Sequence, residues 1–302
     1  MIKLTILGSG AATPTLNRGV TAQYLNFNER RILIDCGEST QLQFRKFGVK
    51  FQRIQYIFIS HLHGDHYLGL SGLLASMHLL GREKDLHIFA PPELEQIIKL
   101  QFELTYVKLN FQIHFHSLTA TDKTKVFEDD NMMVYAFPLK HRITCFGFLF
   151  QEKLKERSII PELIKPNALT IPEMVQLKKG ADIERNGKII SHLTLTNPPP
   201  KPFSYAYCTD TKAMQKLPTW IKGADLLYHE ATFLESEKDR AKATFHTTAH
   251  QAAEIAFAAE VGKLLLGHFS ARYKGTDQHI TEAQAIFQNT VCVEDGDTFL
   301  LG

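Results

Sequence analysis

The sequence has few of the residues that would give it a disulfide framework, and nothing that would anchor it in a membrane. Its 302 residues include four cysteines, which lie far apart and form no CxxC pair. Free thiols in a reducing compartment are the simplest interpretation of that spacing. No apolar run approaches the roughly 18 residues of a membrane span, and the opening "MIKLTILGSG" is too short and too alternating for a signal peptide. We therefore expect a cytoplasmic protein that does not bind membranes.

An excess of charge of either sign is also missing. The 34 Lys and Arg residues against 32 Asp and Glu residues leave a formal net charge of +2. This balance neither demands nor excludes a nucleic-acid partner, so any basic surface must be local. The hydrophobic fraction of 44% is typical of a folded soluble protein, and a chain of this length can bury a large core.

Short apolar segments rich in β-branched and aromatic residues alternate with helical patterns along most of the chain. The segments that predict strands are 3–7, 22–27, 30–36, 54–60, 86–91, 132–139, 146–150, 203–209, 225–231, 263–269, 291–295 and 298–301. The segments that predict helices are 40–47, 67–80, 91–106, 248–261 and 281–289. Strands followed by helices in both halves predict an α/β fold of two sheets with helices outside them.

One stretch, residues 151–202, breaks this rhythm. It holds charge and proline but no long apolar run, and its "PPPKP" segment is typical of a stiff polyproline connection. We interpret it as a mildly basic insertion that protrudes from the core. A solvated connector is the alternative, and composition alone slightly favours the connector.

The segment "ISHLHGDHYLGL", residues 59–70, places three histidines and an aspartate within six positions. His61 and His63 alternate along an extended chain, so their imidazoles point the same way. Asp65 and His66 can turn toward the same point as the next helix begins. Imidazole and carboxylate ligands together suit zinc and its first-row neighbours, so the pattern favours a metal site over a loop with surface histidines.

Further ligands are expected where other apolar strands end. His141 follows the predicted strand at 132–139, Asp210 follows the one at 203–209, and His268 lies near the end of "KLLLGHF". If these strands run alike, their ends meet at one edge of the fold. Each residue alone is weak evidence, since a single histidine at a strand end is more often merely exposed. Together with the 61–66 segment they supply seven candidate ligands.

The order of these ligands, HxHxDH with a later His, Asp and His, resembles the metallo-β-lactamase superfamily. A finer resemblance is to the ribonuclease Z family of tRNA 3′-processing endonucleases. It is carried by "ILGSGAATPTLNRGVTA", "ILIDCGEST", "YHEATF", "FHTTAHQAAEIA" and "LLLGHFSARY", which together span nearly the whole chain. The resemblance implies a metallo-β-lactamase αββα sandwich of two mixed sheets packed face to face, with residues 1–302 as one domain and 151–202 as its inserted, exosite-like arm.

The resemblance also implies a ligand set for two zinc ions per chain, with Mn²⁺ or another divalent metal as an alternative. One ion would be held by His61, His63 and His141. The other would be held by Asp65, His66 and His268, and Asp210 would bridge the two. Two metals roughly 3.5–4 Å apart can lower the pKa of a bridging water and bind a phosphate oxygen at once. The reaction expected is hydroxide attack on a phosphodiester, with Asp65 orienting the water.

The leaving 3′-oxygen needs a proton, and His246 in "FHTTAH" is the candidate acid. Glu230 in "YHEATF" is the partner that would keep it protonated. The alternative for His246 is a residue that merely flanks a helix whose N-cap is Thr247 or Thr248. Without the resemblance this alternative would lead. We also include Thr247 and Thr248 among the expected substrate contacts.

The resemblance makes precursor tRNA the expected partner, and residues 151–202 occupy the interval where the family carries an arm that grips the tRNA elbow. The arm residues expected to contact phosphates are Lys178, Lys179, Arg185 and Lys188. The family's PxKxRN loop appears here as "PTLNRG": Pro14 and Arg18 match, but Leu16 and Gly19 replace the lysine and the asparagine. These two replacements weaken the expected contact with the acceptor end of tRNA.

The leading hypothesis is thus a zinc-dependent endoribonuclease that removes the 3′ trailer from precursor tRNA and leaves a 3′-hydroxyl. The family is typically dimeric, and the apolar helix at 67–80 could supply a homodimer interface, although a core helix explains it equally well. One alternative is a hydrolase of the same fold acting on a small phosphodiester, a sulfate ester or a lactone, for which a basic arm would be useless. Another is a non-catalytic RNA-binding subunit, which the complete set of seven ligands disfavours.

Overall fold

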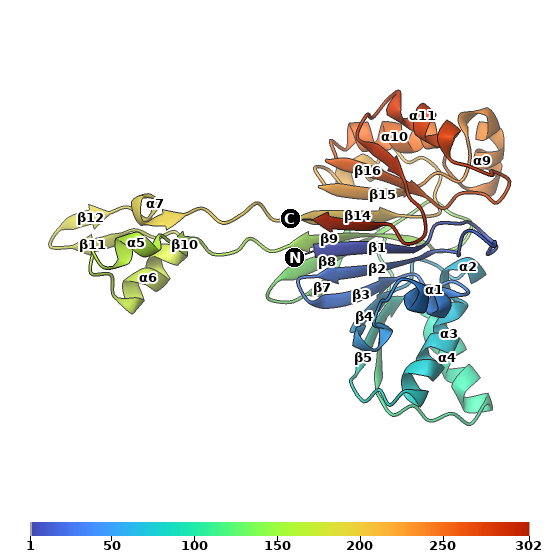
Figure 1. Ribbon diagram of the computed structural model, residues 1–302, viewed down its shortest axis with the longest axis horizontal. Coiled ribbons are helices and arrows are strands. Elements are labelled where there is room, and N and C mark those ends of the chain that lie inside the picture. The colour runs from blue at the N-terminus through green and yellow to red at the C-terminus, as the bar shows by residue number, and fades with distance from the viewer. Residues whose placement is uncertain (1, 302) are drawn as a thin grey trace. The chain divides into compact units, whose positions relative to one another are not determined.

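The computed structural model describes residues 2–301, and they form two compact units. The first unit comprises residues 1–127, 134–150 and 204–302, and the second comprises 128–133 and 151–203. Within the described residues no helix is long and apolar enough to cross a membrane. The helices and strands are labelled in Figure 1.

The first sheet of the larger unit has seven strands in the order β18-β1-β2-β3-β4-β5-β6. It is mixed: β18, β1, β2 and β3 pair antiparallel, and β3 to β6 pair parallel. The bounds are β1 (Ile2–Gly8), β2 (Ala22–Phe27), β3 (Arg30–Ile34), β4 (Tyr56–Phe58), β5 (Leu86–Ala90), β6 (Ile113–Ser117) and β18 (Thr298–Leu301).

The second sheet also has seven strands, in the order β17-β16-β15-β14-β9-β8-β7. Its strands β14 to β17 are parallel, as their helical connections require. The bounds are β7 (Thr124–Glu128), β8 (Met132–Pro138), β9 (Phe146–Glu152), β14 (Ser204–Cys208), β15 (Leu226–Glu230), β16 (Lys263–Gly267) and β17 (Thr290–Cys292).

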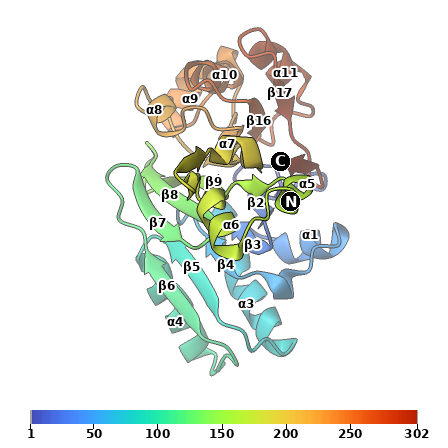
Figure 2. The ribbon, with the colours of Figure 1, turned by 90° about the vertical axis from the view of Figure 1, so that its left-hand side faces the viewer.

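Helices cover the outer faces of both sheets, as Figures 1 and 2 show. On the first sheet they are α1 (Thr40–Lys46), α3 (Gly69–Leu79) and α4 (Glu93–Leu104), with the short η1 (Phe51–Arg53) and α2 (Gly64–Tyr67) beside them. On the side of the second sheet they are α8 (Leu217–Trp220), η2 (Glu235–Glu237), α9 (Lys238–Thr244), α10 (Ala249–Ala258) and α11 (Asp277–Gln284). The predicted αββα sandwich is confirmed.

Aromatic side chains fill the layer between the sheets. The ring of Phe58 on β4 stacks on Phe89 of β5 at 4.5 Å and meets Phe148 and Phe150 of β9 edge-on, each at 5.3 Å. These four rings are almost completely buried, so they contribute a large share of the apolar area removed from water. A rigid layer of this kind fixes where the strand ends lie.

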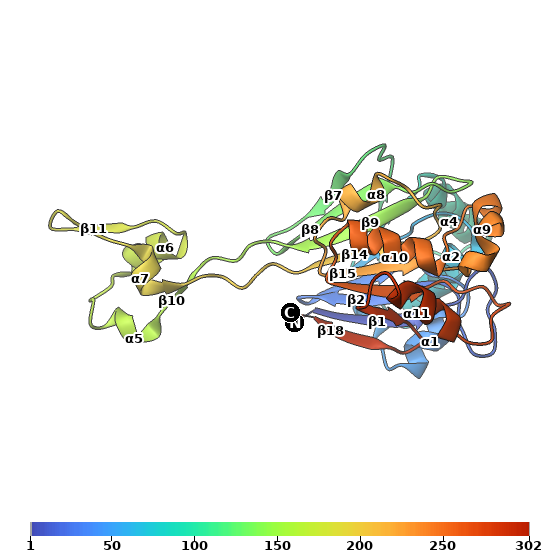
Figure 3. The same cartoon turned by 90° about the horizontal axis from the view of Figure 1, so that it is seen from above.

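Helix α10 illustrates how the sequence covers the outer face of the second sheet. Ala252, Ile255, Ala256 and Ala259 form the predicted stripe and are buried against the second sheet. Thr248 caps the helix: its hydroxyl accepts from the backbone N–H of Gln251 at 3.2 Å. Helix α10 packs on β15 and β16, and α11 packs on α10 and β17 (Figure 3).

The second unit has a small core of its own, made by Leu169, Leu177, Ile183 and Leu195. Its elements are β10 (Ser158–Ile159), α5 (Pro161–Ile164), α6 (Ile171–Lys178), β11 (Ile183–Arg185), β12 (Lys188–Ile190), α7 (His192–Leu195) and β13 (Thr196–Asn197). The second unit thus has a packed core, whereas composition slightly favoured a solvated connector.

Candidate metal centre

The seven candidate ligands come from four places where a strand of the larger unit ends. His61 and His63 follow β4, and Asp65 and His66 lie in the four-residue α2, which begins directly after them. The other three ligands follow β8, β14 and β16 and are His141, Asp210 and His268. The fold therefore gathers at one edge residues that are up to 207 positions apart, from 61 to 268.

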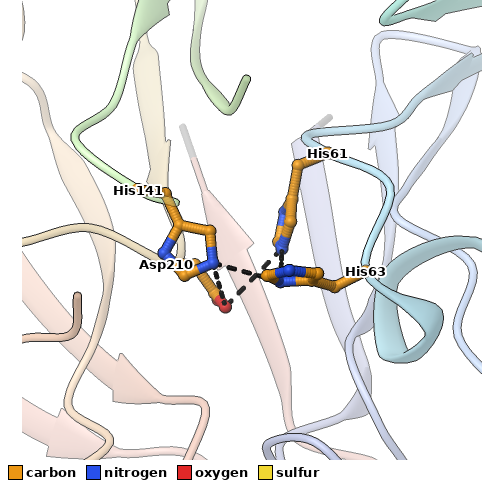
Figure 4. Close-up of side chains that lie close together, drawn as sticks. All are labelled: His61, His63, His141 and Asp210. Carbon is orange, nitrogen blue, oxygen red and sulfur yellow. Dashed lines mark hydrogen bonds and ion pairs between the residues drawn. The ribbon is translucent and has the colours of Figure 1, made fainter. Parts of the chain in front are cut away.

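One group is formed by His61, His63, His141 and Asp210, which point toward one another in Figure 4. Nδ1 of His63 lies 3.1 Å from Nε2 of His61 and 3.1 Å from Nε2 of His141. Oδ2 of Asp210 lies 3.6 Å from each of those two Nε2 atoms. Distances of this size between ligand atoms fit a cation bound between them at about 2.0–2.2 Å.

A second group is formed by Asp65, His66 and His268. Oδ2 of Asp65 lies 3.4 Å from Nε2 of His66 and 3.5 Å from Nε2 of His268. The other carboxylate oxygen of Asp210, Oδ1, lies 3.4 Å and 3.1 Å from the same two nitrogens. Asp210 thus faces one group with each oxygen, which is the geometry that a bridging ligand requires.

The hydrogen bonds made by Nδ1 of the imidazole rings show which ring nitrogens present a lone pair to the site. Nδ1 of His141 can only donate to the backbone carbonyl of Phe245, at 3.2 Å. The hydroxyl of Thr232 donates to Glu230, so it must accept from Nδ1 of His268, at 2.9 Å. Because both Nδ1 atoms carry the proton, both Nε2 atoms present a lone pair to the site.

The same reasoning applies to the buried pair His61 and His66. Nδ1 of His66 donates to Asp35 at 2.8 Å, and Nδ1 of His61 donates to the hydroxyl of Ser60 at 3.0 Å, since that hydroxyl donates to Asp35. Within residues 2–301, the buried Nε2 atoms of His66 and His268 have no hydrogen-bond partner. Converging lone pairs and carboxylates without donors between them fit divalent cations.

Asp35 is a functional residue that the sequence reasoning missed. It is fully buried, and besides His66 it accepts from the backbone N–H of Ser60 at 2.7 Å and from the hydroxyl of Tyr207 at 2.6 Å. Its backbone is left-handed, with φ of 55°, which is rare outside glycine and aims the carboxylate at the ring. The stretch "ILIDCGEST" contains Asp35, but nothing in its pattern shows that the side chain faces the histidines.

His246 and Glu230 form the predicted pair. Nδ1 of His246 lies 3.0 Å and 3.2 Å from the two carboxylate oxygens of Glu230, which is fully buried. Burial alone would lower the pKa of His246, but the Glu230 carboxylate outweighs it and raises that pKa to about 9. In turn, burial would raise the pKa of Glu230, and His246 holds it below its usual value. At neutral pH the pair is an imidazolium beside a carboxylate.

The two groups open into a cavity of about 560 Å³. His63, Asp65, His246 and other site residues form its floor, and its wall includes the arginines Arg142, Arg240 and Arg272. A cavity of this volume admits a nucleotide-sized group, and cationic walls favour an anionic one. The arrangement suits metal-assisted hydrolysis of a phosphate ester.

The expected substrate contacts near the N-terminus and around α10 lie in different settings. Pro14 is exposed. The guanidinium of Arg18 donates to the hydroxyl of Ser9 at 2.7 Å, and it stacks on the ring of Phe269 at 5.1 Å. It therefore ties the loop to the body of the fold.

Thr247 and Thr248 are both fully buried. The hydroxyl of Thr247 donates to the carbonyl of Thr211, and that of Thr248 donates to Glu235 at 2.6 Å. Neither residue lines the cavity. Both hydroxyls fix the start of α10 and do not line the cavity, which differs from the substrate contact expected of these residues.

In the second unit, Lys178, Lys179 and Lys188 are exposed. Arg185 is not free: it makes two hydrogen bonds to Glu173, at 2.6 Å and 2.7 Å, and others to the carbonyls of Asn167 and Ala168. Glu173 is also half of the capping box of α6. Arg185 therefore holds the unit together, which differs from the expected phosphate contact.

Two mixed sheets with helices outside and a double His/Asp centre at one end define a metal-dependent hydrolase of the metallo-β-lactamase fold. Among solved structures, the fold resembles the metallo-β-lactamase fold protein YhfI of Bacillus subtilis, with a TM-score of 0.69, 17% identity and coverage of 99% and 98% of the two chains. Human tRNase Z, short form (ELAC1), aligns with a TM-score of 0.74, 27% identity and 99% of each chain.

Sequence relatives narrow the assignment. A family model described as "Anti-Pycsar protein Apyc1" matches residues 2–158. Over 294 residues, 97% of each chain, the protein is 44% identical to "Ribonuclease Z" of Parabacteroides distasonis. The chain therefore belongs to the ribonuclease Z family, and its residues 2–158 also belong to the family that the Apyc1 model describes. The predicted family is confirmed.

Proposed function

We propose that the protein is a zinc-dependent endoribonuclease that removes the 3′ trailer from precursor tRNA and leaves a 3′-hydroxyl on the tRNA. The observation that carries this proposal is the convergence of seven metal-ligand side chains in a chain 44% identical to a ribonuclease Z. The tRNA substrate is supported by the likeness, over 99% of the chain, to human tRNase Z.

His61, His63 and His141 would hold one cation, and Asp65, His66 and His268 would hold the other, with Asp210 between them. Imidazole and carboxylate donors together favour zinc, and Mn²⁺ or another divalent metal is the alternative. When bound, such a pair of cations supplies an activated water and neutralises charge on the scissile phosphate.

The protein's own residues orient the attacking water and protonate the leaving oxygen. Oδ2 of Asp65 accepts from the backbone N–H of Ala12 at 2.8 Å, which fixes that carboxylate beside the cavity where it can orient a water. His246 lines the same cavity and is protonated at neutral pH because of Glu230. It is placed to give its proton to the leaving 3′-oxygen, which would otherwise depart as a costly alkoxide.

Recognition of the tRNA body is assigned to the second unit. Its exposed lysines, Lys178, Lys179 and Lys188, are available to contact phosphates, which set affinity rather than sequence preference. In the N-terminal loop, Pro14 is the expected contact residue that is exposed. A small-molecule hydrolase would have no use for these lysines.

The protein is also proposed to be a cytoplasmic homodimer. Helices α3 and α4 lie side by side, joined by a hydrogen bond of 2.6 Å from Ser71 to Gln101. Their surface and the following turn expose Leu79, Leu104 and Tyr106, an unusual density of large apolar side chains. The cytoplasmic location is supported by the four cysteines, which are all free and of which three are buried.

The test uses purified protein and a precursor tRNA with a 3′ trailer. Cutting at the tRNA 3′ end is expected, it is abolished by a chelator and restored by Zn²⁺, and Asp65→Ala lowers it by at least about 100-fold. The products are expected to carry a 3′-hydroxyl and a 5′-phosphate. Cutting that is insensitive to chelator, or cutting of a chromogenic phosphodiester but not of precursor tRNA, would overturn the proposal.

A further inference from the structure

A groove of about 390 Å³ runs over the outer face of the first sheet, at the start of β1 and β3. Lys3 and Arg31 contribute to it from register positions that both flank Asn26, so their side chains lie on the same face. Lys50 and Arg53 contribute from the segment that follows α1. The groove shares no lining residue with the catalytic cavity.

The charges of this groove are unbalanced. Its lining contains four cationic side chains, those of Lys3, Arg31, Lys50 and Arg53, and no carboxylate. Arg31 is paired with Glu29 at 2.5 Å, whereas among residues 2–301 the other three form no salt bridge. In a chain whose net charge is only +2, this local concentration attracts an anion.

A second hollow, of about 590 Å³, continues the groove and shares Arg31 and Arg53 with it. It adds the exposed Lys84. The carboxylates that it contains are already engaged, Glu29 by Arg31 and Asp85 by His114 at 2.9 Å. The cations therefore follow a line instead of surrounding a single point, which suits a polyanion better than one small anion.

Aromatic side chains accompany the cations along this line. Phe47 lines the first hollow and is half-buried. Tyr56 lines the second, but its ring already packs on Phe127 at 4.8 Å and on His87 at 5.7 Å, so stacking with a base falls to Phe47. Cations that follow a phosphate backbone beside rings on which bases stack are the combination with which proteins hold single-stranded nucleic acid. Double-stranded RNA would not expose its bases to such rings.

We propose that this basic groove, lined by Lys3, Arg31, Lys50, Arg53 and Phe47, binds a single-stranded RNA segment. The inference rests on the proposed function, because a precursor tRNA supplies such a segment as a 5′ leader or a 3′ trailer. The cations of the groove would contact the sugar–phosphate backbone, which sets affinity rather than sequence preference, so the groove is expected to hold flanking RNA of varied sequence.

The experiment measures binding of a fluorescent single-stranded 12-nucleotide RNA by anisotropy at several salt concentrations, with the full-length protein. The groove variant is Lys3→Glu/Lys50→Glu/Arg53→Glu. The control variant is Lys99→Glu/Lys108→Glu/Lys222→Glu, which changes the net charge equally at sites outside the groove. We expect the groove variant to bind about tenfold more weakly, and its salt slope to fall by about 2, since each lost contact with a single strand contributes about 0.7.

Equal affinities of the groove and control variants would overturn the proposal. A neutral variant, Lys3→Gln/Lys50→Gln/Arg53→Gln, replaces the charge reversal if that protein fails to fold. Binding of the groove variant to precursors with a long 5′ leader or a long 3′ trailer is compared with its binding to a short-flanked precursor. The precursor whose affinity falls more identifies the segment that the groove binds. Wild-type cutting of precursor tRNA is scored separately. If it is absent the proposed function fails, and if it is present while the variants bind alike only the groove fails.

Discussion

The backbone carbonyl of Phe245 accepts the Nδ1 proton of His141 at 3.2 Å, from a residue 104 positions away. Phe245 ends α9 in the left-handed conformation, with φ of 65°, which is strained for a bulky residue. Its ring is held by the ammonium of Lys212, which lies 3.7 Å from the ring centre. The packed ring thus maintains a strained backbone that orients His141, a proposed metal ligand.

Replacing Phe245 separates these roles. Phe245→Ala removes the packed ring and keeps the left-handed strain, so the backbone is expected to relax and metal affinity to fall about tenfold. Phe245→Gly adopts this φ without strain and is expected to stay within about threefold of wild type. Affinity is measured by competition with a chromogenic chelator. If the ring matters only for general stability, both variants will melt earlier and bind metal equally well.

Asp35→Asn tests the buried carboxylate behind His66. The amide cannot accept from Ser60, Tyr207 and His66 as the carboxylate does, so the tautomer and orientation of His66 are no longer fixed. We expect metal affinity to fall by about 10–100-fold, the usual cost of losing a partner behind a ligand. Metal content after dialysis measures this loss of metal affinity. Asp85→Asn, at an exposed carboxylate, is the control, and equal metal content in both variants would contradict the role.

Glu230→Gln tests the acid. His246 must carry a proton to donate it, so activity is lost as pH rises through its pKa, which Glu230 raises to about 9. Without that carboxylate the pKa falls, and the alkaline limb of kcat is expected to move to lower pH by about one unit or more. Bound cations lower the pKa of His246 in wild type and in Glu230→Gln alike. The test is therefore the difference between the alkaline limbs of their two pH profiles of kcat. Superimposable alkaline limbs would remove His246 from the acid role.

His279 predicts a pH dependence of stability. Its ring is fully buried between Phe269 and Tyr273, and burial, aided by Arg18, lowers its pKa to about 4. The unfolded chain, with a pKa near 6.5, binds this proton more readily. The contribution is therefore intact above pH 6.5 and is lost as pH falls toward 4, at a cost of up to about 3 kcal/mol.

His279→Phe should flatten this dependence, because the variant has no group to protonate. Urea unfolding at a series of pH values between 4 and 7 measures it, with the half-exposed His250→Ala as control. Loss of metal in acid affects all three proteins alike. A stability curve for His279→Phe parallel to that of wild type would show that another group dominates.

The convergence of the seven candidate ligands could be predicted from the sequence because they follow the ends of four apolar strands, β4, β8, β14 and β16, which meet at one edge. The strands β6 and β7 were missed, since "IHFHS" and "TKVFE" alternate polar residues that face a partly open layer. The helix predicted at 67–80 corresponds to α3, Gly69–Leu79, and Leu68 separates it from the short α2, Gly64–Tyr67, of which only Tyr67 falls in the predicted range. The one predicted at 281–289 is α11, which begins at Asp277 and ends at Gln284.

The residues that orient the ligands could not be predicted. Asp35 and Phe245 both adopt left-handed backbones, and for the bulky Phe245 local preference argues against this conformation, so tertiary packing decides it. The fold of the second unit was equally hidden, because its core of four buried side chains is too small to give a periodic pattern over 151–202. In each case long-range packing decides the conformation.

The centre draws His61, His63, Asp65 and His66 from the end of a strand in one sheet, and its other ligands from the ends of strands in the opposing sheet. Cations bound there would cross-link the two sheets of the sandwich. Each tenfold excess of free metal over its dissociation constant adds about 1.4 kcal/mol to the stability of the whole body. A chain without bound cations would lack this contribution, so thermal unfolding with and without chelator would measure how far the site links the two sheets.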